Sequence, residues 1–431
     1  MSGTHAETVP YVAPTRYEEA PPPGSTVGAV GWLRANLFSS WLNAALTAAC
    51  VVVLALVLPG VIEWAVLQSV WNASSLDECR QIVVATFGEG ERGACWAVIR
   101  ERFGQMMYGF YPVDLRWRPN VAFLLLIVAV VPILFRTARP IAWAMAVVLA
   151  LEVVVAVRVG EVGALANPTV AVALVAGAVA LLLGQPHHKR WWFVVTALYP
   201  LIAFVLLWGG PVLQPVETSR FGGFLLTMVI GLTGIAGSLP LGVLLALGRQ
   251  SKLPILRIVC VTFIEFIRGV PLITLLFVAS TLLNYFLPPG TSFDLVLRVL
   301  IMVTLFASAY MAEVVRGGLA ALPRGQYEAA DTLGLTYWQS MGLIVLPQAL
   351  KISIPGIVNT FIGLFKDTTL VAVIGLLDPL GLTKPILADA AWNGIIWEMY
   401  GFIAALFFVC CWGMSRYSMF LETRLRASDN R

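Results

Sequence analysis

Residues 328–347 read EAADTLGLTYWQSMGLIVLP, a short segment that lies between two strongly apolar stretches. Its pattern is helical, and Gly334 interrupts it. Because glycine adopts a positive φ without strain, we expect one short helix to end at Gly334 and a second to follow. Two short helices in a loop of an apolar chain indicate contact with something soluble. The alternative is an ordinary amphipathic hairpin at a membrane surface.

The composition indicates that the whole chain uses lipid as its solvent. The 431 residues are 59% hydrophobic and only 12% charged, whereas soluble proteins carry about 25% charged residues. The net charge of +4 is too small to indicate nucleic-acid binding. It fits a membrane protein with basic cytoplasmic loops.

Apolar segments long enough to cross a bilayer recur along the chain. A spanning helix needs about 20 apolar residues. We expect an all-α integral membrane protein with about ten transmembrane helices, at about 40–60, 120–136, 140–158, 168–184, 192–210, 222–248, 258–287, 295–315, 350–375 and 398–420. The ninth is the least regular, because it contains Lys366 and Asp367 and is interrupted by Pro355.

Basic residues in the short loops set the expected orientation. Most of them fall on one side of the membrane if both termini are cytoplasmic, and Arg220 and Lys384 are the exceptions. The residues on the cytoplasmic side are Arg136, Arg139, Lys189, Arg190, Arg249, Lys252, Arg257, Arg416, Arg424, Arg426 and Arg431. The same count places residues 317–347 in the cytoplasm. The polar loop of about 61–119 then lies outside the cell membrane.

The chain divides by composition. Residues 1–35 are Pro-rich, lack a cleavable signal peptide and are expected to be a disordered cytoplasmic tail. Residues 36–215 are expected to form an N-terminal transmembrane region, and 220–425 carry nearly all the internal Gly, Pro and paired charges. We place the boundary in the loop 209–220.

Cys79 and Cys95 share the polar loop, and an extracytoplasmic position favours a disulfide between them, with two free thiols as the alternative. The sequence contains no phosphate-binding loop and no metal-binding or nucleophile motif. We therefore expect no catalytic residue, no metal and no cofactor on this chain.

Ionisable residues near membrane depth are the candidates for a substrate pathway. Glu265 with Arg268, and Glu313 with Arg316, have i,i+3 spacing and can meet on one helical face. With Lys366 and Asp367, these residues could line a pathway for a zwitterion, since buried charges face a bundle interior. The alternative is that the pairs only hold helices together. Pro271, after Gly269, predicts a bend, which marks either a substrate site or a structural kink.

The anchors of the opening segment resemble the EAA loop of bacterial ABC importer permeases: Glu328, Ala329, Ala330, Gly334, Ile344, Leu346 and Pro347. The flanking runs FIEFIRGVPLITLLF at 263–277 and FKDTTLVAVIG at 365–375 are similar to the histidine/glutamine (polar amino acid) group. The run NTFIGLFKDTTL together with MSRYSMFLETRL most resembles the M-type permease of the general L-amino acid ABC importer.

The resemblance implies a type I ABC importer permease core in the C-terminal five helices, preceded by an N-terminal five-helix extension. It implies a subunit that translocates L-amino acids across the bacterial inner membrane. Glu328, Ala329, Ala330 and Gly334, with Tyr337 as added contact area, would couple it to a separate ATPase that binds ATP and Mg²⁺. Further implied partners are a second related permease and a periplasmic amino-acid-binding protein.

Two rival classes stay open. An ATP-independent amino-acid channel or secondary transporter explains the hydrophobicity and buried charges but leaves the EAA pattern unexplained. A membrane enzyme with Glu265 or Glu313 as general base lacks any accompanying nucleophile or metal motif. Co-purification of a nucleotide-binding ATPase separates the permease from the channel.

Overall fold

The computed structural model describes residues 28–135, 141, 143–150, 168–183, 189–210, 213–282, 285, 288 and 293–429. The regular elements among these residues are helices, none is a strand, and Gly109 and Phe221 form an isolated antiparallel bridge. The chain forms two compact units, one of 1–70 with 80–94 and the other of 71–79 with 95–431. The expected tail lies outside the described residues as far as residue 27, and the structure places α1 (Gly28–Asn36) where its last residues were expected to be disordered.

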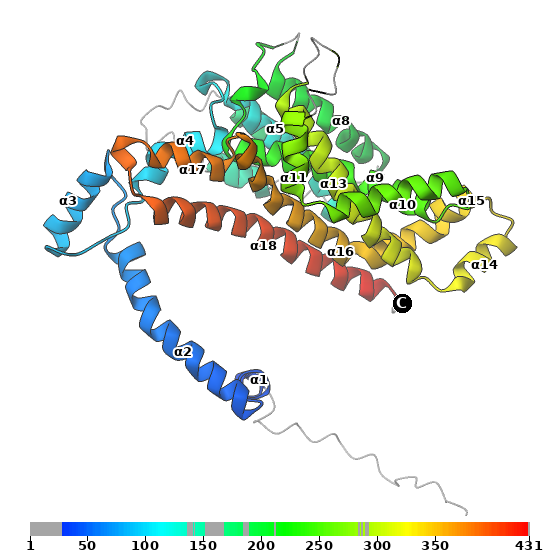
Figure 1. Cartoon of the computed structure of the whole chain (residues 1–431), viewed down its shortest axis with the longest axis horizontal. Helices are drawn as coiled ribbons and strands as arrows, with labels where there is room; N and C mark the ends of the chain where they lie inside the picture. The colour runs from blue at the N-terminus through cyan, green and yellow to red at the C-terminus, as the bar shows by residue number, and fades with distance from the viewer. Residues whose placement is uncertain are drawn as a thin grey trace, which may run out of the picture. The chain divides into compact units, whose positions relative to one another are not determined.

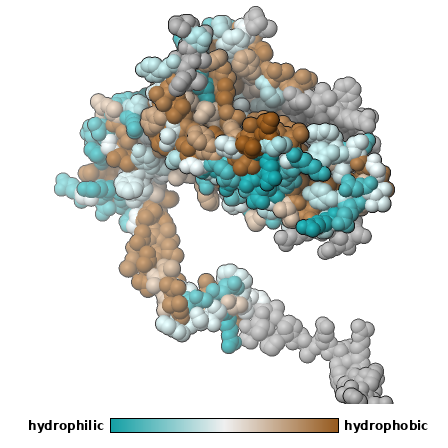
Figure 2. All heavy atoms as spheres, turned by 45° about the vertical axis from the view of Figure 1, so that its right-hand side comes forward, coloured by the Kyte–Doolittle hydropathy of each residue, from teal (hydrophilic) through white to brown (hydrophobic). Residues whose placement is uncertain are grey.

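The first unit is dominated by α2 (Trp41–Ile62), which begins where the hydroxyl of Ser40 accepts from the Asn43 backbone N–H. With its π-helical continuation Glu63–Leu67 it is apolar enough to cross a membrane, as predicted for 40–60. None of its residues is buried, and Figure 2 shows it as an almost continuous hydrophobic column. Helix α3 (Leu76–Phe87) starts in the second unit and continues in the first.

The second unit contains the remaining α-helices, all of which except α7 are labelled in Figure 1. They are α4 (Ala97–Tyr108), α5 (Trp117–Phe135), α7 (Pro168–Leu183), α8 (Lys189–Trp208), α9 (Gly223–Arg249), α10 (Pro254–Gly269), α11 (Leu272–Phe277), α13 (Leu295–Ala320), α14 (Arg324–Thr332), α15 (Tyr337–Ser340), α16 (Leu346–Asp367), α17 (Pro379–Leu387) and α18 (Ile396–Asp429). Among the described residues, five helices of the chain are long and apolar enough to span a membrane.

The broken pair α10 and α11 is a sixth candidate span. Val270 and Pro271 have extended backbone between the two helices, which are bent by 102°. Pro271 cannot donate a helical hydrogen bond, and its ring obstructs the preceding turn. The predicted bend is therefore confirmed.

The other predicted spans fall on α5, α7 and α8, and only part of 140–158 lies within the described residues. Buried Leu124, Met145 and Ala173 pack α5, residues 143–150 and α7 together. These helices belong to the same compact unit as α9–α18, so the units do not separate at 209–220. Tyr111 and Val216 explain this, because both lie in one hydrophobic cluster with Leu226 of α9.

Glycines bring α9 into close contact with α13 and α16. A Cβ on Gly242 would lie 2.6 Å from Met311 Cβ, and one on Gly237 would lie 2.6 Å from Thr304 Cγ2. Toward the start of α9, Gly231 faces Phe365 in the same way. Without side chains at these positions the helix backbones approach closely, as small residues permit in membranes.

Candidate functional site

The segment 324–347 forms the expected two helices with a glycine turn. Gly334 has φ +69°, its N–H donates to the Asp331 carbonyl at 2.9 Å, and the Leu335 N–H donates to the Ala330 carbonyl at 3.2 Å. This pair of bonds is the Schellman arrangement, which ends a helix at a left-handed residue. The predicted role of Gly334 in the turn is confirmed.

The second helix begins at Thr336. The side-chain oxygen of Gln339 accepts from the Thr336 backbone N–H at 3.0 Å and from its hydroxyl at 2.9 Å. These contacts fix α15 directly after the turn. The segment is thus held by defined hydrogen bonds at both helix ends.

Its outer face carries large apolar side chains. Leu333, Tyr337, Trp338 and Leu343 are 72%, 51%, 70% and 71% exposed, and the rings of Tyr337 and Trp338 meet edge to face. Exposed aromatic residues grouped in this way are typical of a protein interface. Leu333 and Leu343 were not among the residues predicted for this surface.

The two alanines of the pattern differ in their surroundings. Ala329 and Glu328 are exposed, whereas Ala330 is completely buried within its own chain. Ala330 therefore packs the segment against the rest of the molecule and offers no surface to another protein. The periodicity could not show which of the two neighbouring alanines faces inward.

The inner face of the segment joins the helix bundle. Met341 and Val345, in a π-helical turn, and Ala349 of α16 lie in one buried cluster with Leu319 of α13 and Ile264 of α10. The Gln348 amide also donates to Gln326 of α14 at 2.9 Å. The segment thus shares one buried apolar cluster with α10, α13 and α16.

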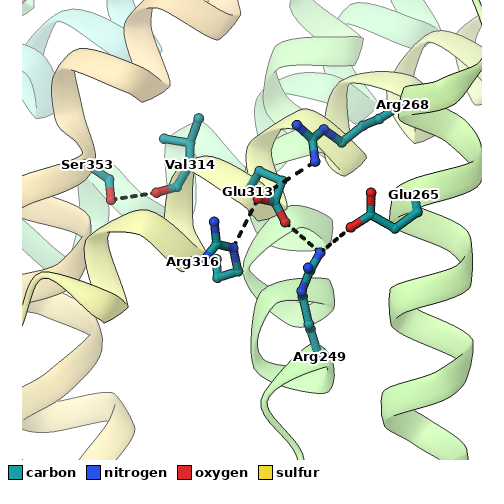
Figure 3. Close-up of polar contacts among 7 residues, drawn as sticks. All are labelled: Arg249, Glu265, Arg268, Glu313, Val314, Arg316 and Ser353. Atoms are coloured by element: carbon teal, nitrogen blue, oxygen red, sulfur yellow. Dashed lines mark hydrogen bonds and ion pairs between the residues drawn. The ribbon is translucent and has the colours of Figure 1, made fainter.

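A charge cluster lies toward the C-terminal ends of α9, α10 and α13 (Figure 3). Glu313 Oε1 is 2.6 Å from Arg249 Nη1, and Glu313 Oε2 is 3.0 Å from Arg316 Nε and 3.7 Å from Arg268 Nη1. The Glu313 side chain is only 17% exposed. One carboxylate therefore receives three guanidinium groups from three helices.

The cluster differs from the expected pairs in one respect. Glu313 and Arg316 do pair within a helix turn, but Arg268 faces Glu313, and Glu265 pairs with Arg249 at 2.9 Å. Arg268 also lies 5.7 Å from the ring of Tyr310. Arg249 was predicted only as a basic loop residue, because sequence spacing within one helix cannot show a partner on another.

Lys366 and Asp367 are not part of this cluster. They end α16, just after Phe365, which faces Gly231 near the start of α9. Glu313 follows Met311, which faces Gly242 near the other end of α9. The separation of 11 positions between these glycines corresponds to about 16 Å along the helix.

At the α4 end of the bundle, Cys79 and Cys95 form a disulfide with a Cα–Cα distance of 5.9 Å. The Cys95 N–H donates to Glu398, at the start of α18, at 3.0 Å. Arg102 of α4 pairs with Asp389. Within the described residues, no three His, Cys, Asp or Glu side chains gather as a metal site.

Comparison with known proteins identifies the family. Residues 238–423 match the model of the binding-protein-dependent transport system inner membrane component. The chain is also 52% identical over 417 residues to the glutamate/glutamine/aspartate/asparagine transport system permease protein BztC of Rhodobacter capsulatus, covering 94% of this chain and 96% of the relative. The chain belongs to the ABC transporter permease family.

Two further relatives show how the resemblance is distributed. The inner membrane amino-acid ABC transporter permease protein YhdY of Escherichia coli is 44% identical and covers 92% of this chain and 93% of its own length. The probable glutamine ABC transporter permease protein GlnP of Bacillus subtilis is 31% identical and covers 47% of this chain but 91% of its own. Nearly the whole of this shorter relative thus aligns with about half of this permease.

Family membership settles the class of protein. The permease is a multi-pass membrane subunit of an ABC transporter and not an enzyme, since the ATPase of these systems is a separate subunit. The reading as an importer permease is supported over an ATP-independent channel or secondary transporter. ABC importer permeases work with ATPase subunits and substrate-binding proteins.

Proposed function

We propose that this permease translocates L-amino acids across the bacterial inner membrane. The observation that carries the proposal is the similarity over nearly the whole chain to a permease named for glutamate, glutamine, aspartate and asparagine transport. In our proposal this permease also accepts L-amino acids other than those four, because its sequence most resembles general amino-acid permeases.

The coupling partner is a pair of ATPase subunits that bind ATP and Mg²⁺ outside this chain. Tyr337, Trp338, Leu333 and Leu343 present an apolar surface for such a subunit. Glu328 and Ala329 are exposed beside it, while Gly334 and buried Ala330 keep the segment rigid. A rigid segment packed on α10, α13 and α16 can pass a displacement to the bundle, which a flexible linker cannot.

The proposed orientation in the membrane rests on features at the two opposite ends of the helix bundle. In Figure 1, α14 and α15 lie at one end of the bundle, and α4 and α17 lie at the other. A disulfide persists in an oxidising compartment, which supports an extracytoplasmic position for Cys79 and Cys95. The segment 324–347 and the C-terminal end of α18 are then cytoplasmic, and the basic loops of the sequence predict the same side for the N-terminus.

The substrate pathway in this proposal runs between the two charged groups. Glu265, Arg268, Glu313 and Arg316 lie at the cytoplasmic end, and Lys366 and Asp367 lie nearer the other end. A zwitterionic amino acid can pair with both signs of charge at each group. Residues 220–425 form the permease domain, 36–215 are its extension, and a second related permease completes the pathway.

Reconstitution tests the proposal. The permease is placed in liposomes with its partner permease and ATPase, and uptake of radiolabelled glutamate, glutamine, aspartate, asparagine and histidine is measured with a purified binding protein outside. We expect uptake only with ATP inside and binding protein present. Uptake of the same size without ATPase would overturn the coupling, and labelled sugar or peptide uptake in place of amino acids would overturn the substrate class.

A further inference from the structure

A polar hollow of about 620 Å³ opens beside α4 in the second unit. Its lining includes Asn72, Glu78, Arg100, Glu101, Arg102 and Trp392. Trp392 is 2% exposed and is therefore buried beneath the surface, whereas Glu78, Arg100 and Glu101 are exposed. The exposed residues give both signs of charge to the hollow.

The walls of the hollow are fixed by bonds between distant parts of the chain. The Cys79–Cys95 disulfide joins its two sides, and the Cys95 N–H is bound by Glu398, which is 6% exposed. Arg102 pairs with Asp389, next to the 3₁₀ turn that carries Trp392. The hollow is therefore preorganised, which lowers the entropy lost when a partner binds.

The charge of Arg100 is available to a partner. Its guanidinium donates to the side-chain oxygen of Asn72, which is a neutral group, so that contact does not cancel the charge. Glu101 stands beside it, also exposed. Trp71, adjacent to Asn72, is 60% exposed and stacks on Trp96 with ring centroids 6.0 Å apart. Exposed Trp and Arg beside a polar hollow are the residue types that carry binding energy at protein interfaces.

The hollow lies at the end of the bundle opposite the segment 324–347, which excludes the ATPase as its occupant. The two segments that build most of it, 72–78 and 100–102, also lie outside the residues that match the family, 238–423. They are an addition to the shared permease core, and their helix α4 packs against α9 and α18. Gly223, the first residue of α9, for example, lies against the backbone of Met106 in α4.

We propose that this hollow is a docking surface for the soluble amino-acid-binding protein of the importer, with Arg100 and Glu101 pairing with a carboxylate and a cation on that protein. The inference rests on the proposed function, because it requires an extracytoplasmic binding protein. The added segment then contributes recognition of that protein beyond what the permease core provides.

The test uses the complete importer in nanodiscs and the purified binding protein that supports uptake in the reconstituted system. We expect Arg100→Glu and Glu101→Arg each to raise the Kd about tenfold at low salt and less at high salt, since exposed charge pairs are screened. The matched control is Arg220→Glu, which reverses an exposed charge in the 3₁₀ turn Thr218–Arg220, just before α9 and outside the hollow.

Each outcome separates the two proposals. An unchanged Kd in both hollow variants, with the wild type binding normally, would overturn the docking surface and leave the proposed function intact. Failure of the wild type to require any binding protein for uptake would overturn the proposed function. Loss of importer assembly in the hollow variants, seen by size-exclusion chromatography, would instead assign the hollow to the partner permease and overturn the docking proposal.

Discussion

Arg249, the last residue of α9, places its Nη1 atom 2.6 Å from Glu313 Oε1 on α13 and 2.9 Å from Glu265 Oε1 on α10. The guanidinium therefore ties three helices at the end that leads into the segment 324–347 (Figure 3). Apolar packing of Met341 and Val345 against the same helices completes the connection. A displacement of the segment thus reaches the charge cluster without a flexible element between them.

Glu313→Gln tests this connection. The glutamine leaves three guanidinium groups without their shared carboxylate, and we expect a loss of about 1–3 kcal/mol of stability because that carboxylate is mostly buried. Uptake falls with ATP hydrolysis less affected. The matched control is Glu265→Gln, whose side chain is 54% exposed and has one partner, so that it costs less than about 1 kcal/mol. Equal melting temperatures for the two variants would contradict a central role for Glu313.

The sequence predicted those features that depend on local chemistry. Gly334 and Pro271 act through the backbone of their own segments, so the turn and the 102° bend could be predicted. Arg249 could not be placed with Glu313, because their contact depends on how three helices meet. The burial of Ala330 depends on which side of α14 faces the bundle, which its spacing alone does not determine.

The amphipathic helix α4 shows the same limit. Residues 61–119 contain no apolar run long enough to span a membrane, so the sequence predicts a polar loop there and no particular helix. Its helix is fixed by contacts with residues about 120–300 positions away, including Asp389, Glu398 and the start of α9. Such contacts leave no periodic signal in the sequence.

Gly334→Val tests the rigid turn of the coupling segment. A β-branched residue at φ +69° is strained by about 1–2 kcal/mol or more, so we expect the segment to rearrange and ATP hydrolysis to continue with uptake reduced. The control is Gly325→Val, in the first turn of α14, where φ is not positive and an added Cβ meets no atom within 4 Å. The ratio of amino acid transported to ATP hydrolysed is the measurement, and an unchanged ratio for Gly334→Val would refute the role of the turn.

Gly318→Val tests the close approach of α13 and α16. A Cβ at Gly318 would lie 2.5 Å from the Ala349 carbonyl oxygen and would also clash with Ser353 Oγ, which bonds to the Val314 carbonyl. We expect a loss of about 1–3 kcal/mol or more from overpacking. Gly317→Val makes the same change in helix propensity, but a Cβ there meets nothing within 4 Å. Thermal unfolding in detergent compares the two, and similar midpoints would show that the helices can separate without cost.

Asp378 supplies a prediction of pH dependence. It lies between two candidate spans, is completely buried and accepts from the Gly381 N–H at 2.8 Å as the cap of α17. Burial raises the pKa of this carboxyl from 3.8 to about 6, against the smaller opposing effect of the backbone hydrogen bonds. The folded protein therefore holds the proton more tightly than the unfolded chain.

The sign of the effect follows from that difference. The stability contributed by protonated Asp378 is fully present below about pH 4 and is lost as the pH rises to about 6, by about 3 kcal/mol in all. Asp378→Asn keeps a side-chain oxygen that can accept from Gly381 but does not titrate. We expect its melting temperature to fall less than that of the wild type between pH 4 and pH 6. Asp331→Asn, at an exposed position in α14, serves as the control. If the wild type and Asp378→Asn lost stability in parallel over this range, other groups would account for the pH dependence and the assignment to Asp378 would be wrong.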